Sequence, residues 1–172
     1  ALCVSYSGQC LFSSLIGNRS GNRGSCVGSC RLPYKIVDND NNQLSKGSYP
    51  LSMKDLNTLE YVGSLIEAGV SSLKIEGRMK SPEYVYTVTK LYRMAIDSYY
   101  ETGKVNIDEN ELNNLKRIFN REFTKGYLFN ERIDNIINDK RPNHQGVIVG
   151  KVIDYKESMI FVRLIDNVHI ND

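Results

Sequence analysis

Four cysteines lie within the first thirty residues of the chain, and they are the only cysteines that it contains. Cys3 and Cys10 precede Cys26 and Cys30, which gives the spacing C-x6-C-x15-C-x3-C. Disulfides need an oxidising compartment, and nothing in the sequence indicates secretion. Four unrelated core cysteines would not normally cluster in so short a segment. The spacing therefore favours a metal or cluster site over disulfides or coincidence.

Two kinds of sulfur-ligated group fit these cysteines. Zinc ribbons use pairs of ligands separated by about two to four residues, and only Cys26 and Cys30 follow that rule. Iron-sulfur clusters tolerate wider and less regular spacing, because a cluster is bulky and is held from several directions. The glycines of this segment suit either group, since they let backbone amides turn toward sulfur. The spacing alone leaves zinc and a cluster both open.

Basic residues surround the second pair of cysteines. Arg19, Arg23, Arg31 and Lys35 occur in this part of the chain, and no acidic residue appears before Asp38. Such a run is either a solvated basic loop or a site for an anion. The net charge of the whole chain is only +2, which does not by itself indicate a nucleic-acid partner. We take the three arginines as candidate substrate-binding residues.

A second group of charges follows in the stretch KIEGRMK. Lys74, Glu76 and Arg78 alternate along a predicted strand, residues 71–77, and its exit, so their side chains project to one side. The carboxyl end of a parallel strand is where α/β barrels keep their active sites. Charges that point into a barrel are costly unless they are paired or used. The three residues are therefore candidate catalytic groups, with a structural ion pair as the alternative.

The sequence offers no nucleophile system of a familiar type. It has two histidines, His144 and His169, and contains neither H-E-x-x-H nor G-x-S-x-G. We interpret each histidine as an ordinary surface residue. Serine or zinc protease chemistry is therefore not expected from these residues.

The expected elements alternate between helix and strand, which indicates an α/β fold. Apolar residues recur at helical spacing before Gly69 and predict a helix of about 13 residues: Leu56, Leu59, Val62 and Ile66. A buried strand is predicted over residues 71–77. A long helix follows with Ser81 as its N-cap, Pro82 in its first turn and Gly103 at its end.

Shorter elements complete the pattern. Asp108 with Glu111 predicts a further helix, which we expect to pack against the preceding one. Leu11–Ile16 can form a helical turn, and short strands are indicated near residues 34–37 and 43–44. Residues 147–153 and 159–165 form two β-rich runs joined by a polar turn, which predicts an antiparallel hairpin.

The composition is that of a soluble globular protein. Hydrophobic residues make up 41% of the chain and charged residues 24%, and the apolar runs are too short to span a membrane. The chain starts at Ala1 without a basic and apolar leader, so we interpret it as an excised fragment.

Several blocks of the sequence, in order, resemble the collagenase-like peptidase family (peptidase family U-thirty-two), whose catalytic mechanism is unassigned. These blocks are ALCVSYSGQCLFS, RSGNRGSC, CRLPY and SLKIEGRMKSPEYV. The family signature Cys-x4-Gly-x-Cys-x-aliphatic-Ser fits Cys3, Gly8, Cys10 and Ser13, while Phe12 replaces the usual aliphatic residue. The resemblance extends to about residue 150.

The resemblance implies a fold and a cofactor. Members of the family look like TIM-type barrels followed by a small β-domain. Residues 1–103 would then be C-terminal barrel elements with the cysteine-rich loop, residues 104–143 a helical connector and residues 144–172 the start of the β-domain. Several relatives bind a 4Fe-4S cluster through four cysteines, which would here be Cys3, Cys10, Cys26 and Cys30, and this favours the cluster over zinc.

The resemblance also implies two functions. Some members carry the name collagenase or protease, and others are implicated in hydroxylation of tRNA, rRNA or the ubiquinone ring, some with prephenate as the suggested oxygen donor. A cluster and a basic run that suits RNA or a dicarboxylate favour a cytoplasmic RNA hydroxylation protein. A genuine peptidase with a protein substrate and catalytic groups outside this chain is the alternative. We expect the fragment itself to be inactive, to lack any membrane association and to self-associate through an exposed sheet edge.

Overall fold

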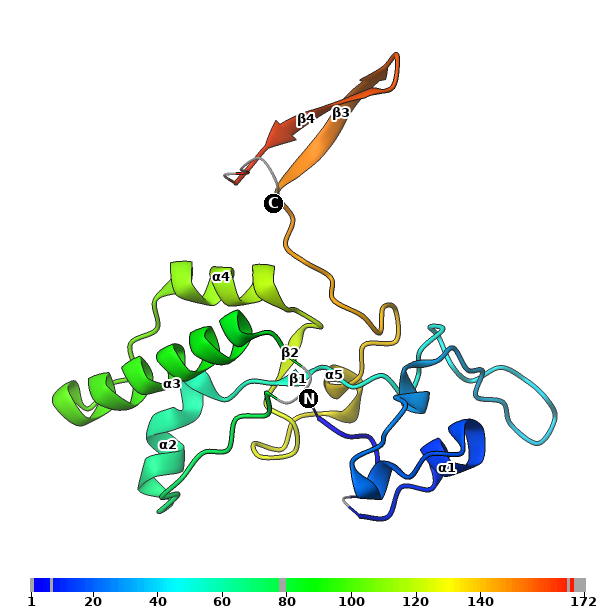
Figure 1. The fold of residues 1–172 in the computed structure, drawn as a ribbon, viewed down its shortest axis with the longest axis horizontal. Coiled ribbons are helices and arrows are strands. Elements are labelled where there is room, and N and C mark those ends of the chain that lie inside the picture. The colour runs from blue at the N-terminus through cyan, green and yellow to red at the C-terminus, as the bar shows by residue number, and fades with distance from the viewer. Residues whose placement is uncertain (1, 7, 78–79, 167, 169–172) are drawn as a thin grey trace.

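The computed structural model describes residues 2–6, 8–77, 80–166 and 168 (Figure 1). These residues form five α-helices, three 3-10 turns and two small two-stranded sheets. The mixture of helix and sheet agrees with the predicted α/β class. In Figure 1 the helices α2, α3 and α4 lie together beside β1 and β2, the segment around α1 lies on the other side of these strands, and the hairpin β3–β4 stands apart at the end of a linker.

The helix α3, Pro82–Thr102, is the longest element and begins and ends as its sequence predicts. The Oγ atom of Ser81 accepts a hydrogen bond from the amide of Tyr84 at 3.3 Å, which satisfies one free amide of the first turn. Gly103 terminates the helix with φ of +71°, a left-handed conformation that glycine adopts without strain. The core forms on one face of α3, where Val88, Leu91 and Ala95 are buried.

The helix α4, Glu109–Ile118, packs against α3 as expected. Asp108 caps it by accepting hydrogen bonds from the amides of Asn110 and Glu111. The side chain of Glu111 does not complete a capping box, because it pairs with Lys90 of α3 at 2.7 Å. Leu115 of α4 joins the core cluster on α3.

The helix predicted around Leu56–Ile66 is shorter than expected. A 3-10 turn, Leu59–Tyr61, leads into α2, Val62–Glu67, and Gly69 follows with φ of +83°. Leu56 lies instead in β1, Asp55–Leu56, which pairs in parallel with β2, Phe123–Thr124. A long-range strand partner has therefore overridden the helical periodicity at this end.

The strand predicted over residues 71–77 is wrong in this structure. These residues have no regular secondary structure, and they run as a loop from α2 to α3 (Figure 1). A strand exists through hydrogen bonds to a neighbouring strand, and no strand pairs with this loop among the residues that the structure describes. Ile75 still packs against the core cluster. The prediction that this apolar segment is buried therefore holds in part at Ile75, whereas the prediction of a strand does not.

The cysteine-rich segment is built from single turns. It contains α1, Phe12–Gly17, and the 3-10 turns η1, Gly21–Arg23, and η2, Ser29–Arg31. The helical turn predicted near α1 is confirmed. Further along, an antiparallel bridge joins Val37 to Gln43, close to the two short strands that were expected.

The predicted hairpin is present. Strands β3, Gly150–Lys156, and β4, Met159–Leu164, pair antiparallel, with a bulge at residue 153. The turn is tighter than expected, since only Glu157 and Ser158 connect the strands, both with positive φ. The hairpin side chains of both strands are exposed.

Residues on both sides of position 103 share one core. The β1–β2 pair joins residues 55–56 to 123–124, and Met53 forms a bridge with Ile137, just after the short helix α5, Ile133–Ile136. The predicted domain limits and the barrel architecture are not tested by this packing and stay predictions. Among the described residues, none of the helices has the length and apolar character needed to cross a membrane.

Candidate functional site

All four cysteines line one cavity of about 160 Å³. Each of them is a free thiol; Cys10 and Cys30 are partly buried, and Cys3 and Cys26 are more exposed. The cavity wall also includes Ser13 and Ser29. The fold has thus brought together residues that are up to 27 positions apart in the sequence, and it has done so without a disulfide.

Helix α1 and the loop after η1 hold Cys26 in place. Ser13 of α1 is buried, and its hydroxyl accepts the amide of Val27 at 3.3 Å and donates to the Sγ atom of Cys26 at 3.5 Å. Gly28, which has a positive φ, donates its amide to the same sulfur at 3.3 Å. Two donors, a hydroxyl and an amide, therefore converge on one sulfur.

These donors act on the acidity of the thiol. The pKa of Cys26 is lowered, mainly by the Ser13 hydroxyl and next by the amide of Gly28, with partial burial acting against them. A thiolate is the form that ligates metals and attacks electrophiles. Amide and hydroxyl donors to sulfur are the usual supports of a metal-bound thiolate.

Cys30 is in a different environment. Burial raises the pKa of its thiol, the guanidinium of Arg31 acts against that rise, and the neighbouring sulfurs of Cys3 and Cys26 add to it. Sulfurs that raise the pKa of the Cys30 thiol are close enough to repel it when both are charged. A bound cation or cationic cluster core would remove that repulsion.

Arg31 fastens this part of the loop to the body of the protein. Its Nη1 atom donates to the Oγ atom of Ser52 at 2.7 Å and to the carbonyl oxygen of Met53. Both acceptor residues are fully buried beside β1. Cys30, the residue before Arg31, is therefore held by a contact that crosses 21 residues of sequence.

The cavity contains an unsatisfied polar atom. The Oγ atom of Ser29 is buried and has no hydrogen-bond partner within the part of the chain that the structure describes. Buried hydroxyls normally have a partner, so this one fits a cavity that receives a polar or charged group. Four free thiols, two donors to sulfur and one orphaned hydroxyl fit a sulfur-ligated group. No three His, Cys, Asp or Glu side chains within the described ranges are grouped around a single ion position.

A larger cavity adjoins the first. It has a volume of about 460 Å³ and shares Cys3 with the cysteine cavity. Lys74 and Glu76 line it together with Tyr84 and Tyr92 of α3. Two of the three predicted catalytic residues thus lie in one cavity with a cysteine, although they come from a loop and not from a strand. Arg78 lies outside the described residues.

A cluster of buried charge lies beside these cavities. Asp55 of β1 is buried, and Arg121 donates to both of its carboxylate oxygens, at 3.1 Å from Nε and 2.5 Å from Nη2. Lys80 is close to this pair, and its ammonium lies 2.8 Å from the ring centre of Phe119. Burial lowers the pKa of Lys80 to about 8, and repulsion from Arg121 contributes next.

A sequence profile of Peptidase family U32 matches residues 1–138 of this chain. The chain belongs to this family. It is 37% identical, over 90% of its length, to a collagenase from Porphyromonas gingivalis, of which it spans 39%. It is 38% identical over 89% of its length to a 23S rRNA 5-hydroxycytidine synthase from Escherichia coli, of which it spans 24%.

A further U32 relative is a tRNA hydroxylation protein P from Helicobacter pylori, 37% identical over 86% of this chain and 36% of that protein. The chain therefore spans well under two thirds of the length of these relatives. No solved structure shows significant similarity to it.

Two of the predicted substrate-binding arginines lie apart from the two cavities that cysteines line. Arg19 and Arg23 are exposed, and neither lines the cysteine cavity or the larger cavity. Arg31 alone of the three lies against the site. Asp55, Lys80 and Arg121 were missed, because they come from three separate segments and only tertiary packing brings them together. The single signal in the sequence was that Lys80 belongs to the stretch KIEGRMK.

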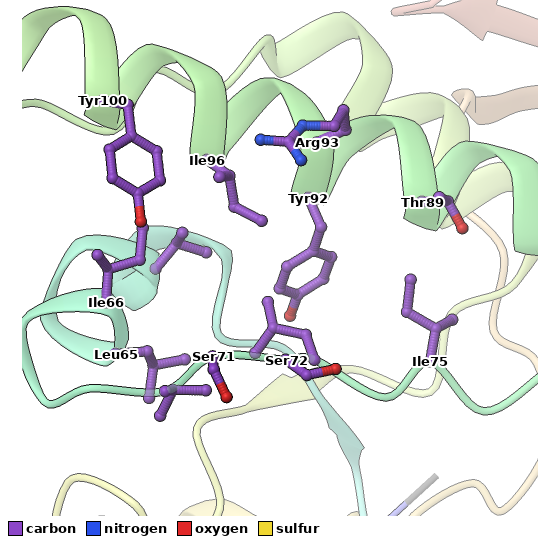
Figure 2. Close-up of a pocket in the computed structure, with 13 residues that line it drawn as sticks. Leu65, Ile66, Ser71, Ser72, Ile75, Thr89, Tyr92, Arg93, Ile96 and Tyr100 are labelled. Atoms are coloured by element: carbon purple, nitrogen blue, oxygen red, sulfur yellow. The ribbon is translucent and has the colours of Figure 1, made fainter.

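A third cavity lies between α2, the loop 70–75 and α3, with a volume of about 380 Å³. Figure 2 shows Tyr92 reaching from α3 toward the loop and Tyr100 reaching from α3 toward Ile66 of α2. Arg93 is the charged residue of its wall, and Asp97 accepts a hydrogen bond from the Nε atom of that arginine at 3.0 Å. Its mostly apolar wall is suited to packing and not to catalysis.

Proposed function

We propose that this chain is part of a U32 protein that hydroxylates RNA with the help of a 4Fe-4S cluster. The observation that carries the proposal is the cavity lined by all four cysteines. Two of the relatives, at 37% and 38% identity, are named for hydroxylation of tRNA and for synthesis of 5-hydroxycytidine in rRNA. Because the chain spans only part of those proteins, the activity of the whole protein is inferred and not observed.

The residues that would hold the cluster are Cys3, Cys10, Cys26 and Cys30. A cubane cluster is much larger than a single ion, and the thiols are distributed around a cavity of about 160 Å³. Zinc, which draws its ligands to one point about 2.3 Å from each sulfur, is the alternative. When bound, the cluster would supply redox or Lewis-acid chemistry.

The protein's own residues have supporting roles in this proposal. Ser13 and Gly28 would keep Cys26 in its thiolate form through their hydrogen bonds to sulfur. Arg31 would fix the position of Cys30 through Ser52. Lys74 and Glu76 would face the substrate in the larger cavity. Arg19 and Arg23, both exposed, would contact RNA phosphates outside the cavity.

Several finer points belong to the same proposal. In the intact protein we place this chain at the C-terminal end of a TIM-type barrel, with the β3–β4 hairpin beginning a small β-domain. A reducing cytoplasm would keep the four thiols free. The oxygen donor would be a small carboxylic acid such as prephenate.

The collagenase relative supports a second candidate, a peptidase with a protein substrate. Its catalytic groups would have to include residues outside this chain, because the described cavities combine cysteines with Lys74 and Glu76 but with no histidine.

One experiment tests the first proposal and separates it from the second. The intact protein is purified without oxygen and analysed for iron, sulfide and zinc, and tRNA and rRNA nucleosides are compared in a deletion strain with and without the gene. We expect iron and sulfide in the wild type, their loss in Cys26→Ser, and a missing hydroxylated nucleoside that wild type restores and Cys26→Ser does not. Ser25→Ala is the matched control.

Iron-free protein that restores the nucleoside would refute the cluster, and gelatin cleavage with unchanged nucleosides would favour the peptidase.

A further inference from the structure

Three cations share one small region with a single carboxylate. Arg31 comes from η2, Lys80 from the loop before α3, and Arg121 from the segment before β2. Their charges are near enough to act on one another, because both arginines depress the pKa of Lys80 and Arg121 depresses that of Arg31. Asp55 is the carboxylate in their midst.

The carboxylate is already occupied. Both oxygens of Asp55 accept hydrogen bonds from Arg121, and the side chains of this pair are only 5% and 11% exposed. Arg31 donates to two neutral oxygens, those of Ser52 and Met53. The pair is therefore neutral as a unit, and the groups that favour the charge of Arg31 are the thiol of Cys30, then Asp55 and the thiol of Cys3.

Lys80 has no ion pair among the residues that the structure describes. Its ammonium instead lies 2.8 Å from the ring centre of Phe119 and 5.2 Å from that of Tyr84. Aromatic faces offset only part of the cost of removing an ammonium from water. Arg121 lies over the same ring, 5.1 Å from its centre, so Lys80 is a partly buried cation with a second cation beside it.

Lys80 lies next to the larger cavity, although none of the three cations is among the residues that line it. Tyr84, which Lys80 contacts, lines that cavity, and so does Cys3, whose thiol is near enough to Arg31 to affect its pKa. A ligand in the cavity of about 460 Å³ would therefore have its body against apolar residues and against Lys74 and Glu76, and it would reach Lys80 by extending past Tyr84.

We propose that Lys80, with the positive charges of Arg31 and Arg121 beside it, binds an oxoanion, a carboxylate or a phosphate, carried by a ligand that extends from the larger cavity. Guanidinium and ammonium groups are the side chains best suited to such anions. The identity of the ligand rests on the proposed function, in which it would be the substrate or its oxygen donor. Binding of the anion can be measured without any catalytic turnover. A bound anion would also give Lys80 the ion-pair partner that it lacks among the described residues.

The test measures anion binding directly. The intact protein, purified without oxygen and with its metal content recorded, is titrated calorimetrically with inorganic phosphate, with succinate and with a short single-stranded RNA. The variants are Lys80→Gln, which removes the charge, and Lys80→Arg, which keeps it. Lys151→Gln is the matched control, because Lys151 is exposed on β3 and far from the cluster in sequence.

We expect Lys80→Gln to weaken binding of phosphate or succinate by about tenfold to a hundredfold, the loss typical of one charged hydrogen bond. Lys80→Arg should restore most of the affinity, and Lys151→Gln should leave it unchanged. If RNA displaces the small anion in wild type, the natural anion is an RNA phosphate; if RNA binds without displacing it, the natural anion is a small carboxylate or phosphate.

The opposite results would overturn the proposal. Equal affinity in wild type and Lys80→Gln, or no measurable binding by wild type at millimolar anion, would show that these cations serve only to balance charge within the protein. Because this readout needs no modified nucleoside, anion binding can fail while RNA hydroxylation is confirmed, and it can succeed when hydroxylation is refuted.

Discussion

The hydroxyl of Ser13 and the sulfur of Cys26 lie 3.5 Å apart, although 13 residues separate them in the sequence. The serine belongs to the same short motif as Cys10, so this contact joins the first pair of cysteines to the second. It also makes Ser13 a residue that positions the sulfur of Cys26 and lowers the pKa of its thiol.

Replacing Ser13 by alanine should therefore raise the pKa of Cys26, because the first of its two stabilising donors is lost. In cluster-free protein, Cys26 should react more slowly with iodoacetamide at neutral pH, as read by mass spectrometry of its peptide. In anaerobically purified protein, affinity for the proposed cluster should fall by about tenfold to a hundredfold. Ser14→Ala, on the same helix, is the control, and equal reactivity in both variants would contradict the assignment.

Removing one partner of the buried pair of Asp55 and Arg121 should destabilise the folded protein strongly. Asp55→Asn leaves a guanidinium without its counter-charge in a site that is nearly inaccessible to water. We expect a loss of about 3–5 kcal/mol in the free energy of unfolding, measured by urea denaturation. The exposed pair of Arg93 and Asp97 is the comparison, and Asp97→Asn should cost about 0.5 kcal/mol or less.

A double variant distinguishes the charge from the packing. Arg121→Met added to Asp55→Asn removes the unpaired cation, so part of the lost stability should return. If the double variant is less stable than Asp55→Asn alone, packing by the arginine stem and not charge pairing is the main contribution.

Lys80 should be unusually reactive near pH 8. Its pKa is lowered to about 8, so a substantial share of its amine is neutral at that pH and free to react. Limited treatment with an acylating reagent, followed by peptide mass spectrometry, should label Lys80 ahead of the exposed Lys151. Saturating phosphate or succinate should slow this labelling if an anion binds there, and preferential labelling of Lys151 in all conditions would contradict the lowered pKa.

The same shift has a consequence for stability. The unfolded chain holds the Lys80 proton up to its ordinary pKa of 10.5, whereas the folded protein releases it near 8. The charged lysine therefore opposes folding below about pH 8, and stability should rise as the pH increases from there toward 10.5. Lys80→Met removes this component, so the variant should be more stable than wild type at pH 7. The difference should shrink as the pH rises from about 8 toward 10.5, as measured by urea titrations of both proteins.

His144 should hold the start of the hairpin linker against α4. Its ring stacks on Phe119 with centres 5.5 Å apart, and its Nδ1 atom accepts the amide of Asn120 at 2.8 Å. His144→Ala should expose the linker at residues 141–149 to limited proteolysis, because about 1 kcal/mol of hydrogen bonding is lost along with the ring contact. Asn143→Ala, which removes an exposed neighbour, should leave the cleavage rate unchanged.

The earlier interpretation of His144 as an ordinary surface residue was thus incomplete. The ring is exposed, yet its Nε2 atom also lies 3.1 Å from the carbonyl oxygen of Arg117. Nothing in the stretch RPNH indicates these contacts, since their partners lie 24 and 27 residues away.

Local elements followed the sequence closely where the signal was local. Ser81 and Gly103 mark the ends of α3 because capping depends on a few neighbouring amides and on the conformational freedom of glycine. The hairpin and the cap at Asp108 are likewise confirmed. Prediction failed at Leu56 and at residues 71–77, because whether a short apolar run becomes a strand depends on a partner that its own residues do not specify.

For the site, the sequence by itself determined the set of thiols and the motif that contains Ser13, because residue type alone decides which atoms can ligate a soft metal. The tertiary structure decided that the four sulfurs border one cavity, that Cys3 is shared with a second one, and that Arg31, Lys80 and Arg121 meet around Asp55. Electrostatic interactions and burial depend on distance in space, and residues from four separate segments acquire that proximity only when the chain packs.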